Sequence, residues 1–262
     1  MSHPDVSTRS VADPFSELLL ASLPPTAAEA ELLEVRLGPF WTVVRTSLGT
    51  GMASTMVREA EPHESVPVRW AGTLHRRTPS ELAGLVRSGS AAEAAVGVAT
   101  VNALLPRPAG LIRDENAFQV LVERGAGRRV AMIGRFPFAD RLRPHCRALW
   151  VFELGSRRRH EDFSDAHAAA LLPEAEVVAI TATTLVHHTL GGILDRLRPE
   201  ALRILLGPST PLAPCLLGRG IDVLCGSVVT DPEKVLRAAS EGAVTPHVSG
   251  VERVSLWREG VR

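Results

Sequence analysis

The sequence predicts an α/β protein in which a small α+β module is followed by a Rossmann-like, doubly wound parallel sheet. In the first half of the chain, strand-like runs precede clear helical signals. From about residue 128, short and nearly continuous apolar runs alternate with stretches that can carry helices. That alternation is typical of strands buried on both faces of a parallel sheet. We place the boundary at the glycines around residue 126, which gives domains of residues 1–125 and 126–262.

In the first domain, prolines and capping residues mark the expected ends of the elements. A short helix is predicted from Phe15 to Ser22, just before two prolines, and two strands from Leu32 to Leu37 and from Trp41 to Thr46. Thr78 and Ser90 each precede a glutamate by three residues, which is the spacing of a capping box. Each of these two residues should therefore begin a helix.

In the second domain, the elements follow the apolar runs. A capping box at 230–233 predicts a helix that stops near Gly242, and the alternation from Glu252 to Trp257 predicts an edge strand. The strands of the parallel sheet are expected at Val130–Ile133, Leu149–Phe152, Val177–Ile180, Ile204–Leu206 and Val223–Leu224.

Composition excludes several classes of function. The 262 residues carry 29 basic and 29 acidic side chains, so the long-range attraction to nucleic acid or acidic membranes is missing. No apolar run approaches the roughly 20 residues of a spanning helix, and we expect no signal peptide because the first residues lack a basic start and an apolar middle. The three cysteines make neither a disulfide framework nor a zinc ribbon. We expect a cytoplasmic protein with a small-molecule ligand, without nucleic-acid or membrane partners, and leave a homo-oligomer open.

The residues that follow each apolar run are the candidates for a binding site. Open α/β sheets bind ligands at the carboxyl ends of their strands, near the point where strand order reverses. Loops that are distant in sequence should therefore meet at one edge of the sheet. The candidates at this edge are Gly134, Arg135, Phe136, Pro137, Glu153, Leu154, Thr183, Thr184, Gly207, Pro208, Ser209 and Thr210.

Glu153 is the most informative of these residues. It ends the second strand, about 20 positions after the glycine of the first, where Rossmann domains place an acid on the ribose hydroxyls of an adenosine. A carboxylate suits this task because it can accept two hydrogen bonds from a diol. The alternative is a solvated glutamate at a strand end.

The loop after the first strand departs from the dinucleotide fingerprint. It has Gly134 alone, followed by Arg135 and the bulky Phe136, and Pro137 removes an N–H that could hold phosphate. An adenosyl ligand without pyrophosphate, such as S-adenosylmethionine, therefore fits better than NAD or FAD. Arg135 either meets a ligand carboxylate or is an ordinary surface arginine.

The turn from Gly207 to Pro211 resembles a strand-to-helix connection. Ser209 or Thr210 could cap a helix that starts at Pro211, leaving free N–H groups for a carboxylate. The alternative is a capped turn without a ligand. Combined with Glu153, the turn would supply the amino-acid end of an adenosyl amino-acid site.

Metal binding is the less favoured alternative. His187 and His188 are adjacent and would point in different directions, and the run from His160 to His167 lacks the spacing of metal ligands. We interpret that run as a solvated loop and Cys215 and Cys225 as buried thiols. No nucleophile–histidine pair can be assembled from spacing alone.

With these segments in order, the chain resembles the "putative heavy-metal chelation" family of domain-of-unknown-function proteins. The resemblance runs from about Gly38 to the end of the chain and lies mainly in four segments, with a further match at Gly97–Ala103. It implies an enolase N-terminal-like domain before the Rossmann-like one, a cleft between them as active site, and Asn102 as a pocket residue. His187 and His188 depart from the asparagine and glycine of relatives. The four segments are Val130–Pro137, Val177–Leu190, Gly207–Pro214 and Gly220–Val235.

Two hypotheses follow. In the first, the protein is an enzyme that binds S-adenosylmethionine, with Glu153 on the ribose and the Gly207–Thr210 turn on the carboxylate. It would cleave the C–S bond by transfer or by cyclisation of the aminocarboxypropyl arm, releasing methylthioadenosine without pyridoxal phosphate, with His187 as candidate base. In the second, it binds a heavy metal or metal chelate through His187, Glu153 or Cys215. A third reading, an NAD-dependent oxidoreductase, is disfavoured by the missing glycines.

Overall fold

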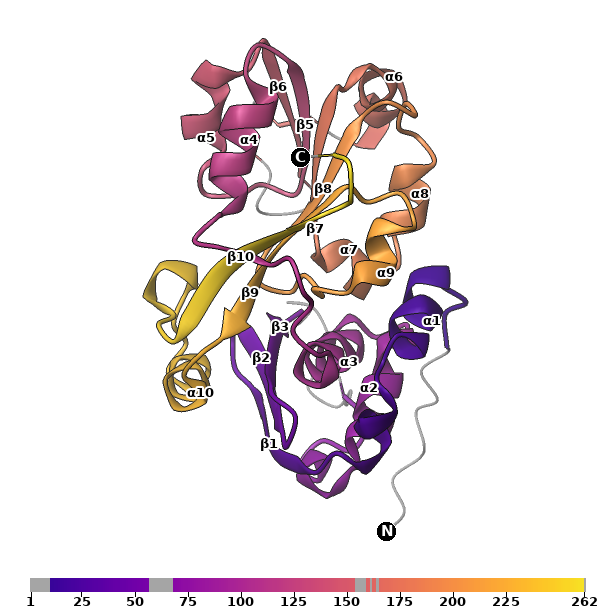
Figure 1. Ribbon diagram of the computed structural model, residues 1–262, viewed down its shortest axis with the longest axis vertical. Helices are drawn as coiled ribbons and strands as arrows, with labels where there is room; N and C mark the ends of the chain where they lie inside the picture. The colour runs from indigo at the N-terminus through magenta and orange to yellow at the C-terminus, as the bar shows by residue number, and fades with distance from the viewer. Residues whose placement is uncertain (1–9, 57–67, 154–158, 161, 164, 262) are drawn as a thin grey trace. The chain divides into compact units, whose positions relative to one another are not determined.

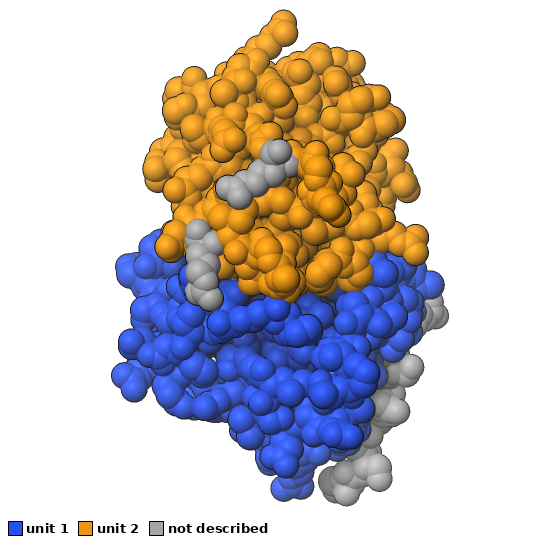
Figure 2. All heavy atoms as spheres, in the orientation of Figure 1, with its two compact units in different colours: residues 1–107, 185–188, 228–252 blue, residues 108–184, 189–227, 253–262 orange. Residues whose placement is uncertain are grey.

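The computed structural model describes residues 10–56, 68–153, 159–160, 162–163 and 165–261. The chain divides into two compact units, coloured separately in Figure 2. Unit 1 comprises residues 1–107, 185–188 and 228–252. Unit 2 comprises residues 108–184, 189–227 and 253–262.

Unit 1 is built on an antiparallel sheet of order β1-β2-β3, formed by Leu32–Leu37, Trp41–Thr46 and Thr50–Ser54. The first two strands have the predicted bounds. Helix α3 packs against β2 and β3, and α10 packs against β1 and β2 (Figure 1). The helices of this unit are α1 (Pro14–Ala21), α2 (Pro79–Gly84), α3 (Ala91–Leu104) and α10 (Pro232–Ser240).

Helix starts in unit 1 follow the predicted caps with two differences. Thr78 forms the complete capping box with Glu81. Ser90 accepts a bond from the Glu93 N–H, but the Glu93 carboxylate turns away to Arg69. At α10 the cap is Asp231, one residue later than the predicted box, because Pro232 takes the first helical position. The residues around each helix start therefore predict that start to within one residue.

Two glycines allow the layers of unit 1 to approach closely. A Cβ atom on Gly51 of β3 would lie 2.2 Å from the carbonyl oxygen of Ala99 in α3. A Cβ on Gly97 of α3 would lie 2.0 Å from the backbone nitrogen of Val86. Both faces of α3 are therefore in contact with backbone, and only glycine fits at these contacts.

Unit 2 contains most of the second sheet, which has the order β4-β10-β9-β8-β7-β5-β6 in the described part of the chain. Strands β5 to β9 pair in parallel, so the predicted α/β class, a small α+β module followed by a doubly wound sheet, is confirmed. The strands are β4 (Ile112–Arg113), β5 (Arg129–Ile133), β6 (Ala148–Phe152), β7 (Val177–Thr181), β8 (Leu202–Leu206), β9 (Val223–Val229) and β10 (Val251–Trp257). The helices are α4 (Ala117–Gly125), α5 (Ala139–Leu142), α6 (Ala168–Leu171), α7 (Thr183–Val186), α8 (Leu190–Leu194) and α9 (Pro214–Leu217).

Strand β10 is not the edge strand that its alternating pattern predicts. It lies between β9 and the two-residue strand β4, which pairs with it through Val254 and Ser255. The segment 112–113 is too short to give a strand signal of its own. A strand beside so short a neighbour keeps an alternating pattern although it is internal.

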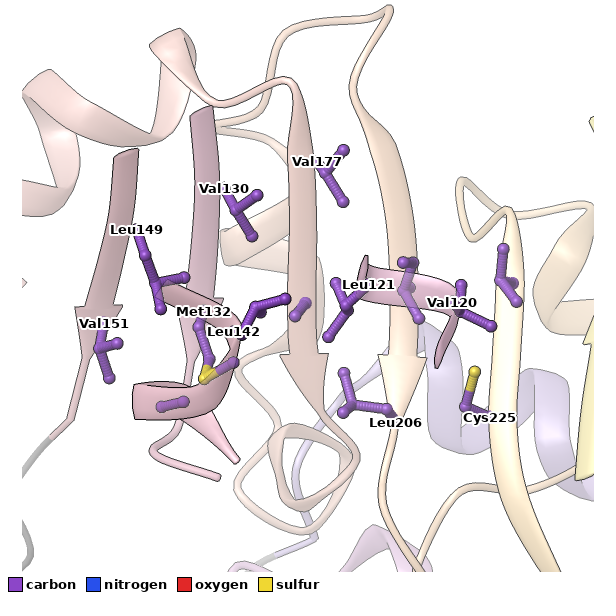
Figure 3. Packing of buried hydrophobic residues seen from close by; sticks show 14 residues of the cluster. Val120, Leu121, Val130, Met132, Leu142, Leu149, Val151, Val177, Leu206 and Cys225 are labelled. Atoms are coloured by element: carbon purple, nitrogen blue, oxygen red, sulfur yellow. The ribbon is translucent and has the colours of Figure 1, made fainter. Parts of the chain in front are cut away.

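One face of the parallel sheet packs on α4 and α5, as Figure 3 shows for residues of this core. Val120 and Leu121 of α4 and Leu142 of α5 meet alternate strand residues such as Met132 and Val177. Most of the intervening residues of β5, β7, β8 and β9 are buried as well. Burial on both faces explains the continuous apolar runs.

The two units do not follow the predicted boundary after residue 125. Helix α4 belongs with unit 2 because Val120 and Leu121 are buried in the core of its sheet. Helix α10 belongs with unit 1, where Val235 and Leu236 pack against Trp41. Sequence order alone does not indicate that a late helix returns to the first unit.

Candidate functional site

The carboxyl edge of the parallel sheet has its reversal of strand order at β5. The chain passes from β5 to β6 on one side and then to β7 on the other, and this switch is the usual ligand position. Gly134 follows β5 with φ +85°, and a Cβ there would lie 2.9 Å from the Thr181 Cγ2 atom. The loop after β5 therefore lies in close contact with the last residue of β7.

Glu153 lies directly after β6 and is 5% exposed. Its Oε2 accepts a hydrogen bond of 2.8 Å from the backbone N–H of Arg135. The contact joins the ends of β5 and β6 and orients the carboxylate at the switch point. Glu153 and the Gly134-Arg135 turn are thus brought together, whereas Leu154 lies outside the described residues.

The Arg135 side chain is turned into the protein, unlike the surface or ligand-facing arginine that the sequence predicted. Its side chain is 8% exposed and forms ion pairs with Asp162 and with Asp140, the latter at 2.8 Å. The backbone N–H of Arg159 also donates to Asp162, at 2.9 Å. This guanidinium is balanced by two carboxylates of the protein itself.

The burial of Asp162 contradicts the prediction of a solvated loop at 160–167. Its side chain is fully buried, and the N–H of Phe163 next to it donates to the Val151 carbonyl of β6 at 2.7 Å. His160 and His167 are exposed as expected. Phe163, which follows Asp162, was an apolar residue that could have indicated burial. The charged residues around it led instead to the prediction of a solvated loop.

The threonines after β7 bond mainly to their own turn. The Thr184 hydroxyl donates to the Thr181 carbonyl at 2.7 Å, and the hydroxyl oxygens of Thr181 and Thr183 are 3.1 Å apart. Thr184 is buried, while Thr183 is partly exposed. Thr183 is therefore the more accessible of the two at this edge.

The turn after β8 is built differently from the prediction. Helix α9 starts at Pro214, not Pro211, and its N-cap is Ala213, so neither Ser209 nor Thr210 caps a helix. Both residues are 2% exposed, and the Thr210 hydroxyl has no hydrogen-bond partner among the described residues. Gly207 has φ +121°, and a Cβ there would lie 3.9 Å from Phe136, so this turn contacts the loop after β5.

Phe136 also anchors the loop after β5. Its ring stacks on that of Phe138 with centroids 5.5 Å apart, and Phe138 lies against Phe118 of α4. Pro137 between them is exposed, and Pro208 after β8 is partly exposed. The aromatic pair makes the loop bulky and rigid where a dinucleotide site would be glycine-rich.

Two predicted residues belong to unit 1. Asn102 of α3 donates through Nδ2 to the Met52 carbonyl of β3 at 3.0 Å, so its amide ties α3 to the antiparallel sheet. His187 is exposed after α7, and its neighbour His188 is turned inward. The two histidines point in different directions, as predicted.

The described residues hold no group of three or more histidine, cysteine or acidic side chains that could bind a metal ion. Burial and the nearby Glu115 charge raise the pKa of Cys225 to about 12, so its thiol stays protonated at neutral pH. Cys225 is therefore a buried core thiol, as predicted. No helix in the described ranges is long and apolar enough to cross a membrane.

Comparison with known proteins gives one family and a fold. A family model described as "Putative heavy-metal chelation" (DUF364) matches residues 116–258, and a second with the same description (DUF4213) matches residues 20–105. An uncharacterized protein of Methanocaldococcus jannaschii is 29% identical over 191 residues, which are 71% of this chain and 72% of that protein.

Two crystal structures of DUF364 proteins with unknown function are similar to most of the chain. The protein from Desulfitobacterium hafniense has a TM-score of 0.80 and 25% identity, covering 93% of this chain and 98% of its own. The protein from Pyrococcus horikoshii has a TM-score of 0.75 and 22% identity, with 92% and 100% covered. The fold is thus shared over nearly the full length.

Proposed function

The chain belongs to the family described as "Putative heavy-metal chelation", and on that premise we propose that its parallel-sheet unit binds an adenosyl compound, S-adenosylmethionine first among them. The proposed site is the carboxyl edge of β5, β6 and β7. The observation that carries the proposal is the position of Glu153, whose carboxylate is held at the end of β6 by the Arg135 N–H.

The anchoring of Glu153 supports a ribose contact. The bond from Arg135 orients the carboxylate toward the edge at which α/β sheets take their ligands. An anchored carboxylate loses little conformational freedom when it accepts hydrogen bonds from a diol. Asp140 and Asp162 balance the Arg135 guanidinium, which lessens its repulsion of a sulfonium.

The turn after β8 supports a second contact. The Thr210 hydroxyl is buried and lacks a partner in the described part of the chain, and a buried hydroxyl without one costs about 1–3 kcal/mol. A ligand carboxylate or amine that met this hydroxyl would recover that free energy. We assign the amino-acid end of the ligand to Gly207, Pro208, Ser209 and Thr210.

The proposed reaction cleaves the bond between sulfur and the γ-carbon of the aminocarboxypropyl arm. In the cyclisation, the amine of the arm attacks this carbon, and the C–S electron pair passes to sulfur. The products are methylthioadenosine, a four-membered cyclic amino acid and a proton. In the transfer, a second substrate supplies the nucleophile. The sulfonium is an activated leaving group, so pyridoxal phosphate is unnecessary and the step needs only a group that accepts the proton.

The test is calorimetric titration with S-adenosylmethionine and methylthioadenosine. The wild-type protein is expected to bind both, and Glu153→Gln to bind both about tenfold or more weakly, because one charge-assisted hydrogen bond is lost. Mass spectrometry of the incubated mixture then identifies methylthioadenosine and the fate of the arm. Absence of binding by the wild-type protein contradicts the proposal.

A matched control is available at the opposite edge of the sheet. Glu176 precedes β7, and its Oε2 likewise accepts a backbone N–H, that of Arg129, at 3.0 Å. Glu176→Gln removes the same kind of charge from the same kind of contact. It should leave adenosyl binding at the wild-type level.

The family description favours a second candidate, binding of a heavy metal or metal chelate. Glu153, Cys215 or His187 is its proposed donor, and a chelate would bring most of the metal's ligands itself. Elemental analysis of purified protein, and melting with and without chelator, test this function. A purified protein that contains no metal, and whose melting temperature is the same with and without chelator, counts against metal binding.

A further inference from the structure

Strand β1 is an edge of the antiparallel sheet in unit 1. In the described part of the chain its only strand partner is β2. Two large apolar side chains of β1 face solvent, Leu33 at 54% exposure and Leu37 at 38%. An exposed apolar edge strand is a template for pairing with another strand.

The hairpin fixes which backbone groups of β1 point outward. The Gly38 N–H donates to the Trp41 carbonyl at 2.8 Å, so Gly38 faces β2. In an antiparallel pair, residues alternate between facing the partner and facing away. Val35 and Leu37 therefore direct their N–H and C=O groups away from β2.

The sequence of β1 is complementary to itself in the antiparallel direction. If two copies pair about Val35, Glu34 of one strand lies opposite Arg36 of the other, and Leu37 lies opposite Leu33, which sits at the irregularity of β1 between Leu32 and Glu34. Val35, with its outward backbone groups, then forms a hydrogen-bonded pair with its own copy. Charges and apolar side chains both match at this single register.

The charged side chains are already placed for such pairing. Glu34 and Arg36 form an ion pair along the strand, and Arg36 Nη1 donates to the Ser240 hydroxyl at 2.7 Å. The Glu34 and Arg36 side chains are 29% and 43% exposed. A second strand would turn this pair into a four-charge cluster across a twofold axis.

We propose that two copies of the protein pair through β1 to form a symmetric dimer. The contact uses the same edge in both copies, so it closes at two and does not extend into a filament. Opposite charges and apolar pairs facing each other across strands stabilise such a ladder. The proposal is independent of the adenosyl site, which lies on unit 2.

Charge reversal tests the pairing. Analytical ultracentrifugation of the wild-type protein over a range of concentrations should show a monomer–dimer equilibrium. Glu34→Arg and Arg36→Glu should each weaken dimerisation about tenfold or more, because both symmetry-related pairs become repulsive. An equimolar mixture of the two variants should form a heterodimer, since every cross-strand pair is again opposite in charge.

The mixture separates this pairing from a folding defect. Each variant keeps like charges on its own strand, so only a contact between copies can restore association on mixing. Glu200→Arg, the same charge change at a 72% exposed side chain of unit 2, is the control and should dimerise like the wild type. A wild-type protein that stays monomeric, or variants that dimerise normally without preferring each other, would overturn the proposal.

Discussion

The Nδ1 atom of His188 lies 3.5 Å from the Oδ2 atom of Asp13, with both side chains less than a tenth exposed. The other ring nitrogen of His188, Nε2, lies 2.8 Å from the Ser88 carbonyl oxygen. The residue adopts φ +55°, a conformation that non-glycine residues seldom take. The His188 ring therefore links three segments of unit 1, and in its protonated form it has two acceptors close by.

This pair predicts a stability that depends on pH in two directions. Asp13 raises the pKa of His188 above its usual value, against the effect of burial and with help from the Ser88 carbonyl. Burial acts to raise the pKa of Asp13, but bonds from His188 and Ser16 outweigh it and lower that pKa. The stabilisation by His188 is complete below its unfolded pKa and is lost as pH rises through the folded pKa. That by Asp13 is complete above its unfolded pKa and is lost as pH falls through the folded pKa. The contribution of this pair to the free energy of unfolding should therefore be largest between the two ordinary pKa values, 3.8 and 6.5.

Asp13→Asn isolates this effect. Asparagine can still cap α1, where Asp13 accepts the Ser16 N–H at 2.8 Å, but it cannot pair with an imidazolium. We expect a loss of about 1–3 kcal/mol near pH 5.5 and a smaller loss near pH 8.5, measured by urea unfolding. His188→Asn, which tolerates the positive φ, should flatten the alkaline side and weaken the acid side, where Asp13 keeps only its bonds from Ser16. An unchanged pH profile in both variants would refute the role of the pair.

Gly134→Ala should disturb the proposed ligand edge. The new methyl group would lie 2.9 Å from the Thr181 side chain, at a φ of +85° that alanine avoids. Gly127→Ala is the matched control, because Gly127 has φ +67° but open space around its Cβ position. Both should lose about 1–2 kcal/mol from backbone strain. The variant at 134 should lose more and also bind the adenosyl ligand more weakly. Equal losses would show that the Thr181 contact is unimportant.

Gly97→Ala should disrupt the packing of α3. A methyl group at this position would overlap the Val86 backbone nitrogen at 2.0 Å, and backbone cannot move aside as a side chain can. We expect a loss of about 3 kcal/mol or more in thermal or urea unfolding. Gly84→Ala, in α2 with nothing near its Cβ position, should instead stabilise the protein by up to about 1 kcal/mol. A stable variant at 97 would contradict the close approach.

Asp162→Asn should loosen the loop network next to Glu153. The buried Arg135 guanidinium would lose one of its two carboxylates, at a cost of roughly 3 kcal/mol. Asp140→Asn removes the other carboxylate, which is 59% exposed and should matter much less to urea unfolding. Comparable effects from the two substitutions would mean that the burial of Asp162 does not increase its contribution to the free energy of unfolding.

Much of the secondary structure could be predicted because it depends on neighbouring residues. Prolines and the Thr78 cap mark helix starts in the sequence, and β1 and β2 have the predicted bounds. The runs that became β5 to β9 were recognisable because strands buried on both faces must be apolar throughout. The predicted solvated loop at Asp162 failed because its ion pair with Arg135 joins residues far apart in the chain, and the helix predicted at Pro211 starts at Pro214 instead.

Local chemistry in the chain was enough to indicate an α/β protein with a glutamate ending its second parallel strand. Strand periodicity and capping depend on residues a few positions apart, so they can be predicted from the sequence. The fold alone decided that Arg135 is balanced by Asp140 and Asp162, that α10 returns to the first unit, and that His188 meets Asp13. Most of these partners lie far apart in sequence, and the strength of each contact depends on how deeply it is buried. Burial and pairing of that kind exist only in the folded chain.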